Sequence, residues 1–238
     1  MYKMSTPELP IRIFIPICYT FAAVLLLVLI PVHFSSNIPF SMFTADPAAS
    51  MNFNPMFGYI SNIGIIFWCA AATVCFLSAG ILNIRKDQSE AIRFLICFGA
   101  LTAVLMFDDL FMFHESIGPN GLNIPEKVNL LMYGAFALFC FTRFYKVILS
   151  NDFRYLVIAT AAFGFSVLVD QLSEKYYFPG EFFVEDGAKF IGIVSWLIYF
   201  VDFSFNKIMS VLAISQIEVL RPRRSPKVRK REMTDSDN

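Results

Sequence analysis

The sequence predicts an all-α protein, a polytopic bundle of six membrane-spanning helices with both termini in the cytoplasm. Three observations predict it. Of the 238 residues, 57% are hydrophobic and only 16% are charged, whereas soluble domains are about 25% charged. Six apolar stretches approach or exceed the roughly 20 residues that a spanning helix needs. Basic residues also alternate between successive loops in the way that orients such helices. A soluble globular protein is therefore excluded.

The predicted spans are, in chain order, 13–31, 58–82, 93–113, 128–148, 155–172 and 189–206. The first is longer than a signal-peptide core and lacks a clear small-residue cleavage site, so we expect it to be retained. The stretch 208–220 is too short to cross again, and it either extends the sixth helix or lies along the membrane surface. Together these segments predict one transmembrane domain, 1–220, followed by a basic, disordered tail, 221–238.

The positions of Lys and Arg predict the orientation. With the N-terminus inside, 16 of the 19 basic residues face the cytoplasm, and only Lys127, Lys175 and Lys189 fall outside. This asymmetry follows the positive-inside rule, so we expect a multi-pass protein of the plasma membrane or an inner membrane. The segment 221–231 holds seven basic residues and no acid, which favours binding to anionic lipid of the inner leaflet. Nucleic-acid binding is not expected, because no folded basic module accompanies this tail.

Acidic residues gather at the predicted outer ends of three helices. Asp108 and Asp109 have apolar residues on both sides, at a depth where an unpaired carboxylate costs at least a few kcal/mol. Asp170 ends the fifth span on a stripe of small residues, which is typical of helix packing. The topology brings the following acids to one membrane level, with His114 and Lys189 beside them: Asp108, Asp109, Glu115, Asp170, Glu185 and Asp186.

This acidic group predicts three kinds of chemistry. Its six carboxylates (Asp108, Asp109, Glu115, Asp170, Glu185 and Asp186) are ligands suited to a divalent cation such as Mg²⁺, Ca²⁺ or Mn²⁺. Buried neighbouring carboxylates also share protons. Alternatively, the acids form ion pairs with Lys189, Lys127 and His114, and Glu185 lies one helical turn before Lys189. The candidate catalytic residues are Asp108, Asp109, His114 and Asp170.

Histidine and cysteine usage narrows the choice of cofactor. The chain has two histidines, His33 and His114, which excludes histidine-box iron sites and three-histidine zinc sites, and a heme is not expected. The five cysteines lie in apolar stretches without a metal or CxxC spacing. We therefore expect them to be small packing residues.

Three functions remain open from the sequence. Asp108-Asp109 resembles the aspartate-rich diphosphate sites of membrane prenyltransferases, but in two residues only, so no family follows. The first hypothesis is an acidic, cation-binding pocket at the outer leaflet that acts on a lipid or isoprenoid headgroup. The second is a proton- or cation-coupled small transporter or channel. The third is a non-catalytic membrane subunit held by structural salt bridges. The sequence does not decide whether the protein is an enzyme.

Overall fold

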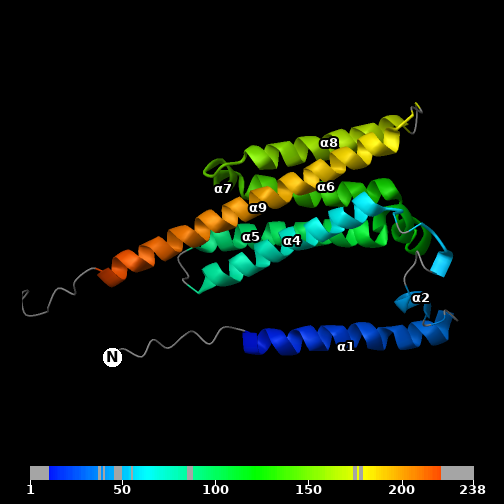
Figure 1. Cartoon of the computed structure of the whole chain (residues 1–238), viewed down its shortest axis with the longest axis horizontal. Coiled ribbons are helices and arrows are strands. Elements are labelled where there is room, and N and C mark those ends of the chain that lie inside the picture. Colours follow the sequence, from blue (N-terminus) through cyan, green and yellow to red (C-terminus); the bar gives the residue numbers. More distant parts are fainter. Residues whose placement is uncertain are drawn as a thin grey trace, which may run out of the picture. The chain divides into compact units, whose positions relative to one another are not determined.

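The computed structural model describes residues 11–36, 39, 41–45, 50–54, 56–84, 88–173, 176 and 179–220, with the backbone alone at 11–14, 17, 18, 36 and 214–220. The elements are α1 (Ile11–Ser36), α2 (Ser41–Thr44), α4 (Tyr59–Asn83), α5 (Ser89–Phe111), the π-helix η1 (Phe113–Gly121), α6 (Glu126–Arg143), α7 (Tyr145–Leu149), α8 (Arg154–Ser173) and α9 (Glu181–Leu220) (Figure 1). The all-α class is thus confirmed over the described residues. The predictions for the tail, disorder at 221–238 and lipid contact at 221–231, lie outside them.

Among the residues whose side chains the structure describes, four helices are long and apolar enough to cross a membrane: Tyr59–Asn83, Ser89–Phe111, Arg154–Ser173 and Glu181–Ala213. In α1, a helix of 26 residues, the apolar stretch with described side chains covers Tyr19–Ser35. The 18 residues of α6 include Glu126, Lys127 and Arg143, so this helix is less apolar than the four. These apolar helices are therefore compatible with a multi-helix membrane protein, and the full count of six spans stays a prediction.

Two predicted boundaries change. The span 128–148 is wrong as a single helix, because α6 ends at Arg143 and α7 begins after Phe144. Phe144 leaves helical geometry (φ −114°, ψ 18°), and its ring packs edge-on against Phe94 with the ring centroids 5.7 Å apart. At the other end of the chain α9 is one helix of 40 residues. Of the two alternatives for 208–220, extension of the sixth helix is therefore the one observed.

Internal contacts divide the chain into two compact units, Met1–Phe57 and Gly58–Asn238. The first unit contains α1, which has Pro16 and Pro31 within its helix, and the four-residue α2. The second unit contains all the other helices and the hydrophobic core. One domain over 1–220 stays a prediction.

In the second unit, α5 and α9 run antiparallel and meet through large side chains. The contacts along them are the ion pair Asp109–Lys189, the hydrogen bond from Trp196 to Thr102, and the ring pairs Phe98–Phe200 and Phe94–Phe203. From one of these contacts to the next, the residues on α5 are seven, four and four positions apart, and their partners on α9 are seven, four and three positions apart. The two helices therefore keep a constant register, with the polar contact at one end and aromatic layers below it.

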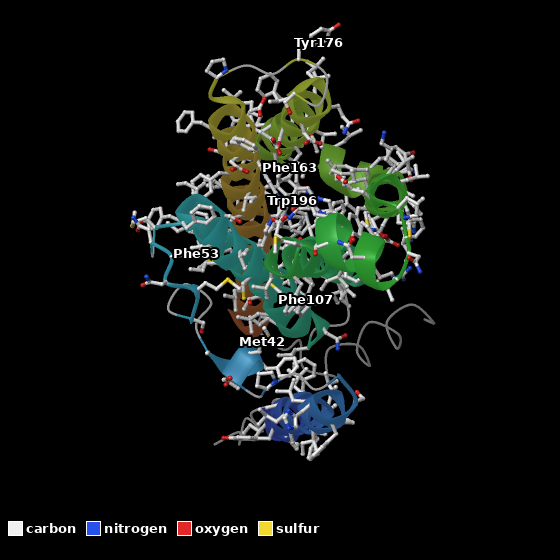
Figure 2. The ribbon with its side chains drawn as sticks, turned by 90° about the vertical axis from the view of Figure 1, so that its right-hand side faces the viewer. Met42, Phe53, Phe107, Phe163, Tyr176 and Trp196 are labelled. Atoms are coloured by element: carbon white, nitrogen blue, oxygen red, sulfur yellow. The ribbon has the colours of Figure 1, made fainter. Side chains whose placement is uncertain are left out.

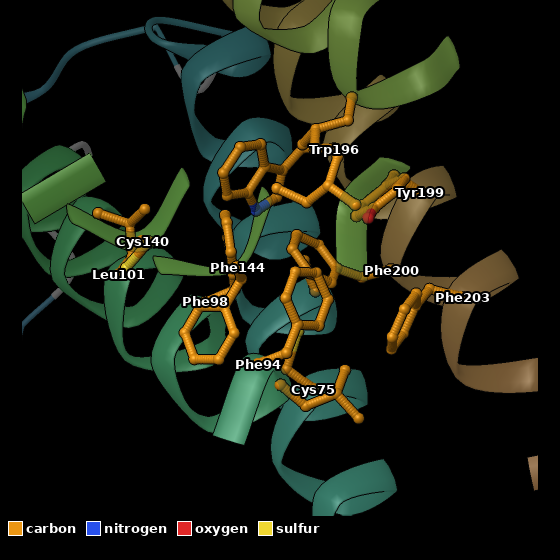
Figure 3. Packing of buried hydrophobic residues seen from close by; sticks show 14 of the residues in the cluster. Cys75, Phe94, Phe98, Leu101, Cys140, Phe144, Trp196, Tyr199, Phe200 and Phe203 are labelled. Carbon is orange, nitrogen blue, oxygen red and sulfur yellow. The ribbon is translucent and has the colours of Figure 1, made fainter. Parts of the chain in front are cut away.

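The aromatic layers form the centre of the core. Figure 3 shows the side chains of Phe94, Phe98, Trp196, Phe200 and Phe203 gathered between the helices. Each of them is at most 2% exposed. Because lipid tails are as apolar as these rings, their contribution to stability comes from close packing rather than from transfer out of water.

Two glycines allow α9 to pack where it does. Gly180 precedes the helix with φ +87°, a conformation that is strained for residues with a Cβ atom. A Cβ atom at Gly192 would lie 2.5 Å from the ring of Phe163, so a larger residue here would force the Phe163 ring to move. Phe163 in turn stacks on Trp68 of α4, with centroids 5.5 Å apart, and it lies close to Trp196 (Figure 2). Gly192 thus permits a contact between three helices.

Candidate functional site

Asp109 connects three helices at the end of α5. Its Oδ1 lies 2.7 Å from Nζ of Lys189 on α9, and its Oδ2 accepts a hydrogen bond of 2.8 Å from the indole N–H of Trp68 on α4. The Asp109 side chain is only 10% exposed. Both carboxylate oxygens are therefore satisfied, which offsets the cost of placing a charge at this depth. We interpret Asp109 as a structural link between α4, α5 and α9.

Asp108 is bound by a different set of neighbours. Its Oδ1 accepts hydrogen bonds of 2.9 Å from the Tyr133 hydroxyl on α6 and from the backbone N–H of His114. Its Oδ2 lies 2.5 Å from Nδ1 of the His114 ring. The residue is 5% exposed, so these contacts replace the hydration that the carboxylate gives up.

The break between α5 and η1 produces this arrangement. Met112 adopts a left-handed conformation (φ 49°, ψ 47°), and its N–H bonds back to the carbonyl oxygen of Asp108. The chain then continues as the π-helix η1, so His114 turns back onto the Asp108 side chain. Asp108 and Glu115 are seven residues apart, a spacing that would place them on one face of a continuous helix. They do not share such a face, because α5 ends at Phe111 before Glu115 is reached.

His114 has one nitrogen held and the other turned toward an exposed acid. An ionised carboxylate only accepts hydrogen bonds, so Asp108 keeps the ring proton on Nδ1. Nε2 lies 3.4 Å from Oε1 of Glu115, whose side chain is 58% exposed. The hydrogen bond to Asp108 raises the pKa of His114 above its usual 6.5, burial opposes this rise, and the charges of Asp108 and Glu115 add to it. The positive charge of Lys189 lowers the His114 pKa.

The other predicted acids lie on α8 and α9. Asp170 accepts a hydrogen bond of 3.2 Å from its neighbour Gln171. Glu185 lies within electrostatic range of Asp170 and Asp186. Lys189 pairs with Asp109 rather than with Glu185, the partner one turn before it. Asp186 and Lys189 contribute to a cavity of about 20 Å³ that is also lined by Asp109 and Ser61, and such a volume has room for about one water molecule.

The predicted metal ligands are therefore divided between separate contacts. Adjacent residues on a helix point about 100° apart, so Asp108 faces α6 and η1 while Asp109 faces α4 and α9. Among the described residues, no three His, Cys, Asp or Glu side chains are grouped so that they could hold a metal ion. The cation site formed by Asp108, Asp109, Glu115, Asp170, Glu185 and Asp186 stays a prediction.

Sequence reasoning missed the partners of the two aspartates. Trp68 was not assigned a role, although its indole N–H lies within a helix that is long and apolar enough to cross a membrane and there needs an acceptor. Tyr133 was not identified as a partner of Asp108. Asn129, one turn before Tyr133 on α6, is 2% exposed, and its amide nitrogen has no hydrogen-bond partner among the described residues.

An apolar groove lies between α8 and α9 near the same end of the helices. Its volume is about 470 Å³, and its lining residues are Ala162, Phe165, Phe183, Val184, Gly187, Ala188 and Ile191. Asp186 and Lys189 point about 100° or more away from Gly187 on α9, so the groove and the small polar cavity lie on different faces of this helix. The groove is open and lacks charged lining residues.

A family model matches residues 18–203, which is more than half of the chain and includes every candidate site residue. The model is described as "Domain of unknown function (DUF8692)". The chain belongs to this family. No curated protein and no solved structure matches the chain.

Proposed function

We propose that the protein is an integral membrane protein that binds the polar headgroup of a membrane lipid at the η1 end of α5, with His114 exchanging a proton there. The observation that carries this proposal is the contact between Asp108 and Nδ1 of His114. It leaves Nε2 beside the exposed Glu115 as the nitrogen that gains and loses a proton. An imidazole oriented by a carboxylate is a common acid–base group.

The charges around His114 favour a headgroup that carries an ammonium group. Lys189 is already paired with Asp109, while Glu115 is mostly exposed and Glu185 is half-buried. The cavity of about 20 Å³ beside Lys189 is too small for a headgroup, so the ligand lies over the exposed rim at Glu115. The groove between α8 and α9, which lacks charged lining residues, suits the acyl chain of the same lipid.

Transport is supported less well than headgroup binding. A proton or cation pathway needs polar side chains or water along its length. Below the Asp109–Lys189 pair, the described residues between α5 and α9 are the aromatic layers of Trp196, Phe98, Phe200 and Phe94, each at most 2% exposed. These layers favour a site that is open only at one end.

The topology is part of the proposal. Six spans with cytoplasmic termini in a cell membrane place His114 outside, and the distribution of basic residues supports this orientation. In a chain whose five cysteines are replaced by Ser, we expect the variant Ser116→Cys to react with an impermeant maleimide on intact cells. The matched variant Ser150→Cys, at a position that is also exposed in the structure, should react only after the cells are permeabilised. The reverse pattern would invert the orientation.

Histidine NMR tests the proposed role of His114. The chain holds two histidines, so a His33→Gln variant leaves one labelled ring to follow. We expect this ring to carry its proton on Nδ1 and to titrate with a pKa above 6.5. The same raised pKa predicts how the stability of the protein changes with pH. A raised folded-state pKa stabilises the protein fully below about pH 6.5, and this contribution is lost as the pH rises through the folded-state pKa.

Lipid selectivity is the second part of this experiment. Short-chain phosphatidylethanolamine should lower the His114 pKa, because a bound ammonium group disfavours the imidazolium. Phosphatidylglycerol, which lacks the ammonium group, is the matched control and should not lower it. His114→Gln should lose the pH dependence of Tm. A wild-type pKa at or below 6.5, or the same response to both lipids, would contradict the proposal.

A further inference from the structure

Two cysteines from different helices face each other in the second unit. Sγ of Cys97 on α5 lies 2.8 Å from Sγ of Cys140 on α6. The Cys140 thiol also lies 3.9 Å from the carbonyl oxygen of Cys97. Both cysteines are free thiols, and they are 43 residues apart in the chain. From the sequence we expected both cysteines to be packing residues. Their pairing could not be predicted, because it depends on how α6 lies against α5.

The contact between the two sulfur atoms is close to bonding geometry. A disulfide has an S–S distance of about 2.05 Å, so the sulfur atoms need to approach each other by about 0.8 Å. Cys69 and Cys75, also free thiols in the described part of the chain, have no comparable contact with another sulfur. Cys69 is exposed and Cys75 is buried, so neither exposure nor burial by itself distinguishes the Cys97–Cys140 pair.

The surroundings of the pair select the class of oxidant. Cys140 is fully buried and Cys97 is half-buried. Cys97 lies eight residues into α5, about 12 Å along a helix that is apolar enough to cross a membrane. A water-soluble reagent has no aqueous route to such a position, whereas a lipid-soluble one reaches the half-buried thiol from the bilayer.

We propose that Cys97 and Cys140 are a redox-active dithiol that a lipid-soluble quinone oxidises to a disulfide between α5 and α6. Both S–H bonds break and one S–S bond forms. The two protons and two electrons pass to the quinone, which becomes the hydroquinone. A thiol reductant reverses the change by exchange through a mixed disulfide. Tyr133 lies on α6 seven residues before Cys140, so the disulfide fixes to α5 the helix that holds the Asp108 side chain.

The test uses the full-length chain in lipid nanodiscs, with Cys18, Cys69 and Cys75 replaced by Ser. Incubation with a decyl-substituted benzoquinone should remove both remaining thiols, as counted with maleimide after denaturation. The intact mass should fall by two hydrogen atoms, and dithiothreitol added after denaturation should restore both thiols. A sulfonated, water-soluble benzoquinone should act at least about tenfold more slowly, because access limits the reaction. The reduced and oxidised forms should also differ in Tm, with the oxidised form the more stable.

Matched variants separate this outcome from trivial oxidation. Restoring Cys75, a buried thiol on α4, should leave the third thiol free and the disulfide unchanged. Variants that contain only Cys97 or only Cys140 should keep their single thiol. Two thiols that persist in the presence of the quinone, or a mass increase from a quinone adduct, would overturn the proposal. So would equal rates with the two quinones, or thiol loss in the single-cysteine variants.

Discussion

Replacing Asp109 by Ala is expected to destabilise the folded protein by about 2 to 3 kcal/mol, because the change leaves the Lys189 ammonium without its counter-ion. The same change removes the acceptor for the Trp68 indole N–H, so α4 and α9 each lose one polar contact with α5. The Lys189 side chain is 37% exposed, and it can turn partly to water. For this reason the expected loss of stability is smaller than the largest losses, about 5 kcal/mol, that follow when one partner of a buried ion pair is removed. Denaturant unfolding in detergent micelles measures it.

The double variant Asp109→Ala with Lys189→Met should recover part of this loss, because it removes both charges. Asp170→Ala is the matched control. Asp170 is a half-buried acid whose carboxylate accepts a hydrogen bond from the adjacent Gln171, and we expect a loss of less than about 0.5 kcal/mol. Equal losses for Asp109→Ala and Asp170→Ala would show that Asp109 is not a structural link.

Replacing Phe98 by Ala is expected to cost about 2 kcal/mol through the cavity that it leaves among the aromatic layers. Phe98 is fully buried and contacts the rings of Phe94, Trp196 and Phe200. In water such a substitution costs about 3–5 kcal/mol. In a bilayer the removed ring would lie in lipid in the unfolded state, so only the lost packing counts. The free energy of unfolding in micelles reports the difference.

Phe107 provides the control on the same helix. Its side chain is 49% exposed, and it stacks on Phe111 with centroids 6.1 Å apart. Phe107→Ala opens no internal cavity, so we expect a change within about 0.5 kcal/mol. If both variants lose the same stability, the core does not lie where the aromatic layers of α5 and α9 place it.

The positions of several helices follow directly from the hydropathy pattern. The spans predicted at 58–82 and 155–172 correspond to α4, Tyr59–Asn83, and α8, Arg154–Ser173. Apolar runs bounded by charges or by glycine carry this information locally. The break at Phe144 was not predicted from this pattern. At the break, the Phe144 ring packs against Phe94, which lies 50 residues away in the chain.

The candidate site could be predicted only in part, because some of its features are visible in the local sequence and others depend on distant residues. Asp108 and Asp109 are recognisable in the sequence because charges between apolar residues need partners. His114 and Lys189 were identified beside them. The sequence does not show which acid each of these residues contacts. Helical spacing suggested that Lys189 pairs with Glu185, but Lys189 contacts Asp109 instead.

The composition and hydropathy of the chain predict an all-α protein with helices suited to a membrane, and they reveal carboxylates where unpaired charge is costly. The packing of the helices makes Asp109 a structural link, whereas Asp108 orients His114. The two roles differ because neighbouring residues on a helix differ by about 100° in direction. Which helix lies in each direction depends on contacts between residues far apart in the chain, such as Gly192 with Phe163 and Cys97 with Cys140.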